Sequence, residues 1–330
     1  TIHARVKIEK EILEEEGFSV SLFSGFDSVI PNLIIKIFNL LTLKYFDWGY
    51  IFSIVKISKK YDIVLIYNFK LLPLVLFVKN KKIIYQTLDH NVSYHFYELS
   101  KRLPPLSYFK KILLPTFTYL EKNIAKKASN IIVNSYPLGD YLANSIVNLY
   151  SSPFEGISLS HNSHKKFALL YVGKLSVEKG SLETVQLANR MNIPLYIFGR
   201  IGDLKTKEIL QDKMCNFIGN FPPEKLLIEL KKLSENFNFL GVSLIKKSHF
   251  SYSIQEANKD IDYLALGVPI IGNERLPTKE KIDAGCGFFI NDVNDINDIK
   301  DYDKLSNNCV EYYNRFYTKE IFKKNLLKAI

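Results

Sequence analysis

The sequence predicts an α/β protein with two parallel sheets, and two features of its pattern carry that prediction. Short apolar runs alternate with longer amphipathic segments, as in strands and helices that follow one another in βαβ units. The short runs are rich in Ile, Val and Leu on both faces, which is typical of parallel strands covered by helices. We expect strands at residues 18–23, 62–67, 82–88, 130–135, 167–173, 194–199 and 267–272.

The length of 330 residues suits two domains of average size. A stretch rich in Ser, Gly, Asn and His, with no periodic pattern, separates the fourth apolar run from the fifth and is typical of a linker. We therefore expect a first domain at 1–150, a linker at 151–166, a second domain at 167–303 and a closing helix at 304–330. Because the first domain opens on a helical pattern, we expect its first strand to be missing from this sequence.

Positive charge is concentrated in the first half of the chain. Residues 1–150 hold 19 Lys and Arg against 12 Asp and Glu, within a net charge of +10 for the whole sequence. Residues 101–127 carry seven basic side chains and a single acid, Glu121, interleaved with Leu, Phe and Tyr. This pattern fits an anionic membrane surface, and it fits equally a solvated basic face that affects mainly solubility. No recognised nucleic-acid motif accompanies the charge, so we expect no nucleic-acid partner.

The three cysteines, Cys215, Cys286 and Cys309, form no CxxC pair and have no histidines at zinc spacing. They predict neither a disulfide framework nor a zinc site, and they favour a reducing, cytoplasmic location. The basic first half extends this expectation to a peripheral position at the inner face of the cytoplasmic membrane.

A short helix is expected at residues 259–266, where charges precede an apolar segment. Asn258 is a good N-cap, Gly267 suits the turn after the helix, and Pro269 prevents its continuation. The N–H groups of a first helical turn can bind phosphate, and Asp262, one turn in, can accept hydrogen bonds from a diol. The presence of Asp260 and Asp262 near the start of this helix is also explained without a ligand, because acidic side chains there interact favourably with the helix dipole.

A second segment favours the phosphate interpretation. The run ending at Gly173 is followed by Lys174 and Lys179, with Glu178 as the sole acid nearby. Two lysines at the end of a strand suit a diphosphate, because ligands of parallel sheets bind beyond the carboxyl ends of the strands.

Together these segments resemble the donor-binding domain of GT-B glycosyltransferases, particularly the retaining family 4. That family shows a strand followed by G-R-x-x-x-x-K-G, matched here by Gly173-Lys174 and Lys179-Gly180. It then shows P-x-K-x-x-E-Y-x-A-x-G-x-P-V-I. This sequence has Asn258, Lys259, Asp262, Tyr263, Ala265, Gly267, Pro269, Ile270 and Ile271 in that order. A strand, glycine and helix at 216–230 and helix and strand patterns in the first half also resemble the family, so the likeness covers nearly the whole chain.

The resemblance implies a GT-B fold, with two Rossmann-like domains facing a central cleft. It implies that Gly173, Lys174 and Lys179 hold the donor diphosphate with Asn258 and Lys259, and that Asp262 holds the ribose. The sequence departs from the family in having Lys174 in place of Arg, Asp262 in place of Glu, and Ile254 where an upstream Glu is usual. Glu256 is the nearest acid and a further candidate donor contact.

In the first domain, Asp89 and His90 follow an expected strand directly, where the family commonly has a histidine that contacts the transferred sugar. We therefore regard them as candidate catalytic residues, with a loop cap as the alternative. Asp260 and Asp262 match the D-x-D pattern of metal-dependent transferases, but residues i and i+2 of a helix do not share a face. We expect no metal and no cofactor besides the nucleotide sugar.

The resemblance thus implies a metal-independent, retaining transferase that moves a sugar from a nucleotide sugar to a saccharide acceptor. A lipid-linked acceptor in bacterial surface glycan synthesis would suit the basic first domain. Two alternatives remain open at this point: a non-catalytic GT-B-shaped partner, or co-chaperone, of an active transferase, and a sugar-nucleotide epimerase of the same fold.

Overall fold

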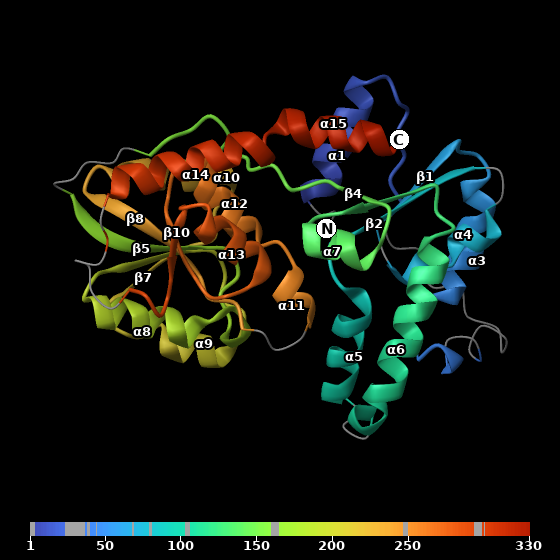
Figure 1. Cartoon of the computed structure of the whole chain (residues 1–330), viewed down its shortest axis with the longest axis horizontal. Coiled ribbons are helices and arrows are strands. Elements are labelled where there is room, and N and C mark those ends of the chain that lie inside the picture. Colours follow the sequence, from blue (N-terminus) through green and yellow to red (C-terminus); the bar gives the residue numbers. More distant parts are fainter. Residues whose placement is uncertain are drawn as a thin grey trace. The chain divides into compact units, whose positions relative to one another are not determined.

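The computed structural model describes residues 4–23, 37, 40–43, 45–67, 69–78, 81–102, 106–159, 165–246, 250–293, 299 and 301–330. Figure 1 shows the order of its elements along the chain. The chain divides into two compact units. Unit 1 comprises Thr1–Leu149, His249–Ser251 and Phe322–Ile330, and unit 2 comprises Tyr150–Ser248 and Tyr252–Ile321. The helices α11 and α15 therefore each begin in one unit and end in the other. No helix in the described ranges has the length and apolarity needed to cross a membrane.

Unit 1 is built on a parallel four-stranded sheet in the order β1-β2-β3-β4. Its elements are α1 (Ala4–Glu15), α3 (Trp48–Ser58), β1 (Ile63–Ile66), α4 (Leu74–Phe77), β2 (Lys82–Thr87), α5 (Asn91–Arg102), α6 (Leu106–Ala125), β3 (Asn130–Val133), α7 (Tyr136–Tyr141), β4 (Ser145–Val147) and α15 (Lys319–Ala329). One of its cores forms where α1 and α15 meet the middle strands, around Ile12, Ile84, Ile132 and Leu326.

Unit 2 is built on a parallel six-stranded sheet in the order β10-β9-β8-β5-β6-β7. Its elements are β5 (Lys166–Val172), α8 (Ser181–Met191), β6 (Leu195–Phe198), α9 (Leu204–Ile209), β7 (Cys215–Gly219), α10 (Pro223–Ser234), β8 (Phe237–Ser243), α11 (Phe250–Ile254), α12 (Asn258–Ala265), β9 (Ile270–Gly272), α13 (Leu276–Asp283), β10 (Gly287–Phe289) and α14 (Tyr302–Phe316). Helices α8 and α9 cover one face of the sheet, and α10, α12 and α14 lie over the other (Figure 1).

The predicted α/β class with two parallel sheets is confirmed, and six of the seven expected strands are present. The exception is 18–23, of which the structure makes an extended segment without strand pairing. Strands β4, β8 and β10 were not expected from the apolar runs.

The single closing helix expected at 304–330 is wrong, because two helices occupy this part of the chain. Helix α14 ends at Phe316, and Thr318 begins α15 by accepting a hydrogen bond from the N–H of Ile321 at 3.3 Å. A threonine at this position is a typical N-cap, so the break has a local signal. The last eight residues of α15, together with Ile330, belong to unit 1.

Candidate functional site

In unit 2, the turn that follows β5 is fixed by short polar contacts. The N–H of Gly173 donates to the carbonyl of Phe198 at 2.8 Å, at a backbone φ of +111° that suits glycine. Ser176 then accepts the N–H of Lys179 at 3.3 Å, and Asp203 accepts the N–H of Val177 at 3.0 Å. These contacts hold a single turn of 3-10 helix at Val177–Lys179, which Gly180 separates from α8.

Gly180, between this turn and α8, is required by close packing as well as by its φ of +79°. A Cβ atom at this position would lie 2.0 Å from the carbonyl oxygen of Leu244. The start of α8 therefore lies directly against the segment that follows β8, and the carboxyl ends of β5 and β8 are held together at the same edge of the sheet.

The two lysines of the turn have different surroundings, solvent for Lys174 and an aromatic ring for Lys179. Lys174 is exposed, and the ammonium of Lys179 lies 4.7 Å from the ring centroid of Tyr252. Tyr252 in turn contacts Glu178 through its hydroxyl at 3.5 Å.

Lys259, in the first turn of α12, is a buried lysine whose ammonium has no hydrogen-bond partner among the described residues. Its side chain is 8% exposed, and its Nζ lies 4.1 Å from the ring centroid of Tyr171. Burial lowers the pKa of Lys259 to about 7. The carboxylate of Asp260 opposes this shift, and the positive charges of Lys179 and Arg275 add to it.

The amino end of α12 has no side-chain cap. We expected Asn258 to be the N-cap, but the cap is Ala257, with extended dihedral angles of −100° and 112°, and Asn258 is the first helical residue. An alanine side chain cannot accept the N–H groups of the first turn. An uncapped helix start therefore lies beside the buried ammonium of Lys259, and both favour an anion.

The carboxyl end of α12 is as expected at Gly267, which has a φ of +68°. Its N–H donates to the carbonyl of Leu264 at 3.1 Å, and the next N–H, of Val268, donates to Tyr263 at 2.8 Å. This pair of hydrogen bonds is the Schellman motif, which ends a helix at a glycine.

A buried arginine holds the chain that leads into α12. Arg275 donates to the carbonyl of Tyr252 at 2.7 Å, to the carbonyl of Gln255, and to Thr278 at 3.3 Å. Thr278 donates to one carboxylate oxygen of Asp260 at 2.8 Å. The first turn of α12 is thus attached to α13, which fixes the position of Lys259.

Glu256 lies inside this part of unit 2. One of its carboxylate oxygens accepts hydrogen bonds from Lys281 at 2.8 Å and from the N–H of Ala257 at 3.2 Å. The other accepts from the Tyr317 hydroxyl at 3.3 Å. The acid therefore joins α12 to α13 and α14 in the protein interior.

Asp262 lies one residue beyond the first turn of α12 and contacts the segment before β5. Its carboxylate accepts a hydrogen bond from the Ser152 hydroxyl at 2.7 Å. Burial raises the pKa of Asp262 to about 7, against the effect of the Ser152 hydrogen bond and with a further contribution from Asp260.

In unit 1, Asp89 and His90 lie between β2 and α5. His90 is buried, and its Nδ1 accepts the N–H of Ser93 at 3.2 Å, which is an N-cap contact. In a neutral ring this bond places the proton on Nε2. The ring packs on Tyr141 at a centroid distance of 4.0 Å, and Asp89 accepts from the Ser251 hydroxyl at 3.4 Å.

Beneath His90 lies a buried carboxylate, Glu121, that the sequence reasoning did not select. It accepts hydrogen bonds from Tyr141 at 2.9 Å and from Tyr85 and Asn91 at 3.3 Å each. Burial raises the pKa of Glu121, and these hydrogen bonds act in the opposite direction. The one feature of the sequence that distinguishes Glu121 is that it is the single acid among the seven basic residues of 101–127. In unit 2 the structure thus places Lys179 close enough to Lys259 for their charges to interact, while Lys174 is exposed and Asp262 contacts Ser152. In unit 1, Asp89 and His90 are consecutive residues between β2 and α5.

Two parallel-sheet units of this kind define the GT-B fold of glycosyltransferases, and comparison with solved structures confirms it. The chain is similar to Anabaena HepE in complex with UDP and glucose, with a TM-score of 0.61, 16% identity and coverage of 97% of this chain and 88% of that one. It is also similar to the lipopolysaccharide outer core galactosyltransferase WaaB, with a TM-score of 0.56, 14% identity and coverage of 90% and 81%. A glycosyltransferase from Rickettsia africae gives a TM-score of 0.55 and 12% identity over 97% and 86% of the two chains. No family model matches the sequence, and no curated protein matches it.

Proposed function

We propose that this protein is a glycosyltransferase that moves a sugar from a nucleotide-sugar donor to a saccharide acceptor. The observation that carries the proposal is the buried, unpartnered ammonium of Lys259 beside the uncapped start of α12. A buried charge without a partner is unfavourable, and a diphosphate would give it and the first-turn N–H groups oxygen acceptors. The similar HepE structures contain UDP and UDP-glucose, so we propose a uridine diphosphate sugar as the donor.

In this proposal four of the candidate residues of unit 2 act on the donor. Lys174, Lys179 and Lys259 stabilise the negative charge that develops on the leaving diphosphate as the glycosidic bond breaks. Asp262 accepts hydrogen bonds from the ribose hydroxyls. The lysines supply positive charge without a metal ion, and we propose a metal-independent reaction that retains the anomeric configuration. Asp89 and His90 of unit 1 are proposed to contact the sugar or the acceptor.

Nucleotide binding is the first property to test, by thermal unfolding with UDP-, GDP-, ADP- and dTDP-sugars and their nucleoside diphosphates. A ligand that binds the native state raises the melting temperature, with about 2.7 kcal/mol of stabilisation at a hundredfold excess over Kd. We expect one nucleotide to do so. In Lys179→Ala its affinity should fall about tenfold, because one charged phosphate contact is lost.

The matched control for this test is Lys232→Ala, which removes an exposed lysine of α10 and should bind as the wild type does. If no nucleotide shifts the melting temperature of the wild type, the donor site does not exist and the non-catalytic alternative is preferred. Product analysis after incubation with the donor alone would reveal an epimerase.

We further propose that the acceptor is lipid-linked, in surface glycan synthesis, and that α6 contacts an anionic membrane. Three apolar side chains at helical spacing are far more exposed than usual: Tyr108 at 83%, Ile112 at 70% and Tyr119 at 73%. Lys111 and Lys122 lie on the neighbouring strip of the same helix. An apolar strip flanked by lysines is typical of helices that lie in the membrane interface.

This surface is tested by sedimentation with vesicles of phosphatidylglycerol or phosphatidylcholine. We expect binding to phosphatidylglycerol that weakens as salt is added, because the lysines contribute through screened charge. Replacing both Tyr108 and Ile112 by serine should reduce the bound fraction several-fold, on the order of the apolar area removed. Leu204→Ser, which alters an equally exposed residue of α9, is the control. Equal losses in both proteins would contradict the proposal.

A further inference from the structure

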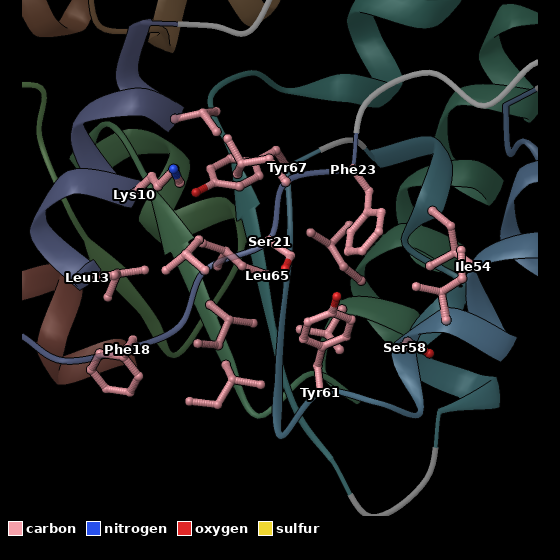
Figure 2. A pocket seen from close by; sticks show the side chains of 18 of the residues that line it. Lys10, Leu13, Phe18, Ser21, Phe23, Ile54, Ser58, Tyr61, Leu65 and Tyr67 are labelled. Carbon is pink, nitrogen blue, oxygen red and sulfur yellow. The ribbon is translucent and has the colours of Figure 1, made fainter.

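Two buried carboxylates lie among the described residues of unit 1, and only one of them forms an ion pair. Glu9 of α1 is fully buried and pairs with Arg5 at 2.7 Å. It also accepts a hydrogen bond from Tyr67 at 2.6 Å, and Figure 2 shows Tyr67 among the side chains that line an apolar cavity of about 390 Å³. Glu121 of α6 is only 1% exposed, yet no basic side chain of the described chain forms an ion pair with it.

The two acids lie on opposite faces of the four-stranded sheet. Gln86 donates to Glu9 at 2.8 Å, whereas Tyr85, the residue before it in β2, donates to Glu121 at 3.3 Å. Successive residues of a strand point to opposite faces. Arg5 therefore balances the charge of Glu9 on one face, and Glu121 is left on the other face with neutral hydrogen-bond donors.

A buried carboxylate without a counter-ion is unfavourable, so Glu121 is costly as a purely structural residue. An ionised carboxylate has only acceptor atoms, and each polar group that contacts it has to donate. Tyr141, Tyr85 and Asn91 donate to it, so the acid fixes the orientation of all three groups. A glutamine of the same shape would not do this, because its NH₂ group is itself a donor.

Two of these donors are connected directly to His90. The hydroxyl of Tyr141 donates to Glu121 at 2.9 Å, and the ring of the same residue lies 4.0 Å from the His90 ring between centroids. Burial, and then the charge of Glu121, raise the pKa of Tyr141, so that its hydroxyl remains a donor. Asn91 follows His90 in the chain, and its amide donates to Glu121 at 3.3 Å and to Thr87 at 2.7 Å.

We propose that Glu121 is a positioning residue for sugar transfer, which holds the ring of His90 through the Tyr141 hydroxyl and the Asn91 amide. This inference rests on the proposed function, in which His90 contacts the sugar or the acceptor. Ser93 fixes the imidazole at Nδ1, and Tyr141 supports its ring. Such support matters for the rate, because a misplacement of about 1 Å at a reacting group can cost about a hundredfold.

The test compares two variants that disturb this arrangement with one matched control. Tyr141→Phe keeps the ring beside His90 and removes the hydroxyl from Glu121, and Glu121→Gln replaces one acceptor oxygen by a donor. Tyr67→Phe removes the same hydroxyl from Glu9 on the other face and is the control. For the release of UDP from UDP-glucose, we expect each of the first two variants to lower kcat about tenfold and to change KM by less than about twofold. Tyr67→Phe should lower the melting temperature and leave kcat unchanged.

The double variant separates positioning from packing. If Glu121 acts mainly through Tyr141, the two changes together should lower kcat by little more than about tenfold, because the second change removes a contact that is already lost. Independent effects would instead multiply to about a hundredfold. That larger loss, or an equal loss of kcat in Tyr67→Phe, would overturn the proposal.

The imidazole resonances of His90 in NMR spectra give a readout that needs no donor. They are identified by their loss in His90→Gln. We expect them to shift in Glu121→Gln and in Tyr141→Phe, because the ring that lies against the imidazole is no longer held, and to stay in place in Tyr67→Phe. Unchanged His90 signals in both variants would overturn the proposal whether or not the protein transfers sugar. Shifted signals in a protein whose wild type releases no nucleotide would contradict the proposed function and leave Glu121 as the residue that positions His90.

Discussion

Replacing Lys259 by methionine is expected to weaken nucleoside diphosphate binding by about a hundredfold or more, because the proposed donor site would lose a desolvated charge that pairs with phosphate. The same change is expected to make the unliganded protein more stable. Methionine is unbranched and apolar, and its sulfur can lie over the ring of Tyr171, where the ammonium lies now at 4.1 Å. A residue that is kept at a cost in stability is typical of a binding site.

The stability gain follows from the lowered pKa of Lys259. With a pKa of about 7 in the folded protein and about 10.4 in the unfolded chain, the unfolded state binds more protons throughout the window between these values. The lysine therefore costs stability at pH 7, and the cost disappears as the pH rises toward 10. We expect Lys259→Met to raise the free energy of unfolding at pH 7 by about 2–4 kcal/mol.

Urea unfolding at pH 7 and at pH 9.5, with calorimetric titration of the nucleotide found in the thermal screen, measures both effects. The gain in stability should be smaller at the higher pH. Lys232→Met on α10 is the control and should change neither property. A variant that loses stability and binding together would show that Lys259 is only part of the packing, and a variant that still binds would remove it from the donor site.

The sequence is enough to predict those elements whose formation depends on a repeating apolar pattern or on a single local residue. The strands β1, β2 and β5 are apolar on both faces, and this alone identifies them as parallel strands in a covered sheet. The end of α12 was also predictable, because the positive φ of Gly267 is a local requirement. The break between α14 and α15 also has a local signal, the N-cap Thr318.

Other features depend on contacts between distant parts of the chain. Strand β8 contains Asn238 and Gly241, which weaken a strand pattern, and the glycine is needed because a Cβ there would lie 2.4 Å from the ring of Tyr263. In the same way, the spacing of residues predicts that Lys259 lies at the start of a helix, but its burial depends on Tyr171 in β5. The internal position of Glu256 depends on Lys281, which lies on a later helix.

Donor affinity is expected to depend on pH in a bell shape with its maximum near neutrality, because two groups with similar pKa values act in opposite directions. In the proposed donor site, Lys259 would hold phosphate in its protonated form, so affinity should fall as the pH rises above about 7. In the same proposed site, Asp262 would accept the ribose hydroxyls best as a carboxylate, so affinity should fall as the pH decreases below about 7. Two pH units above the maximum, the protonated fraction of Lys259 falls from about a half to about a hundredth, so this residue alone predicts a loss of about fiftyfold.

Two variants separate the acidic side of this pH profile (its acidic limb) from the alkaline side (its alkaline limb) when Kd is measured by titration from pH 5 to pH 9.5. Lys259→Arg keeps its charge at every pH and should flatten the alkaline limb, although its planar head group will bind less well than lysine in a site shaped for an ammonium. Asp262→Asn cannot ionise and should flatten the acidic limb, while it still accepts the Ser152 hydrogen bond. A wild-type profile that is flat across this range would mean that neither side chain contacts the donor. An alkaline limb that persists in Lys259→Arg would assign that limb to another group, and Lys179 beside Tyr252 would then be the first to replace.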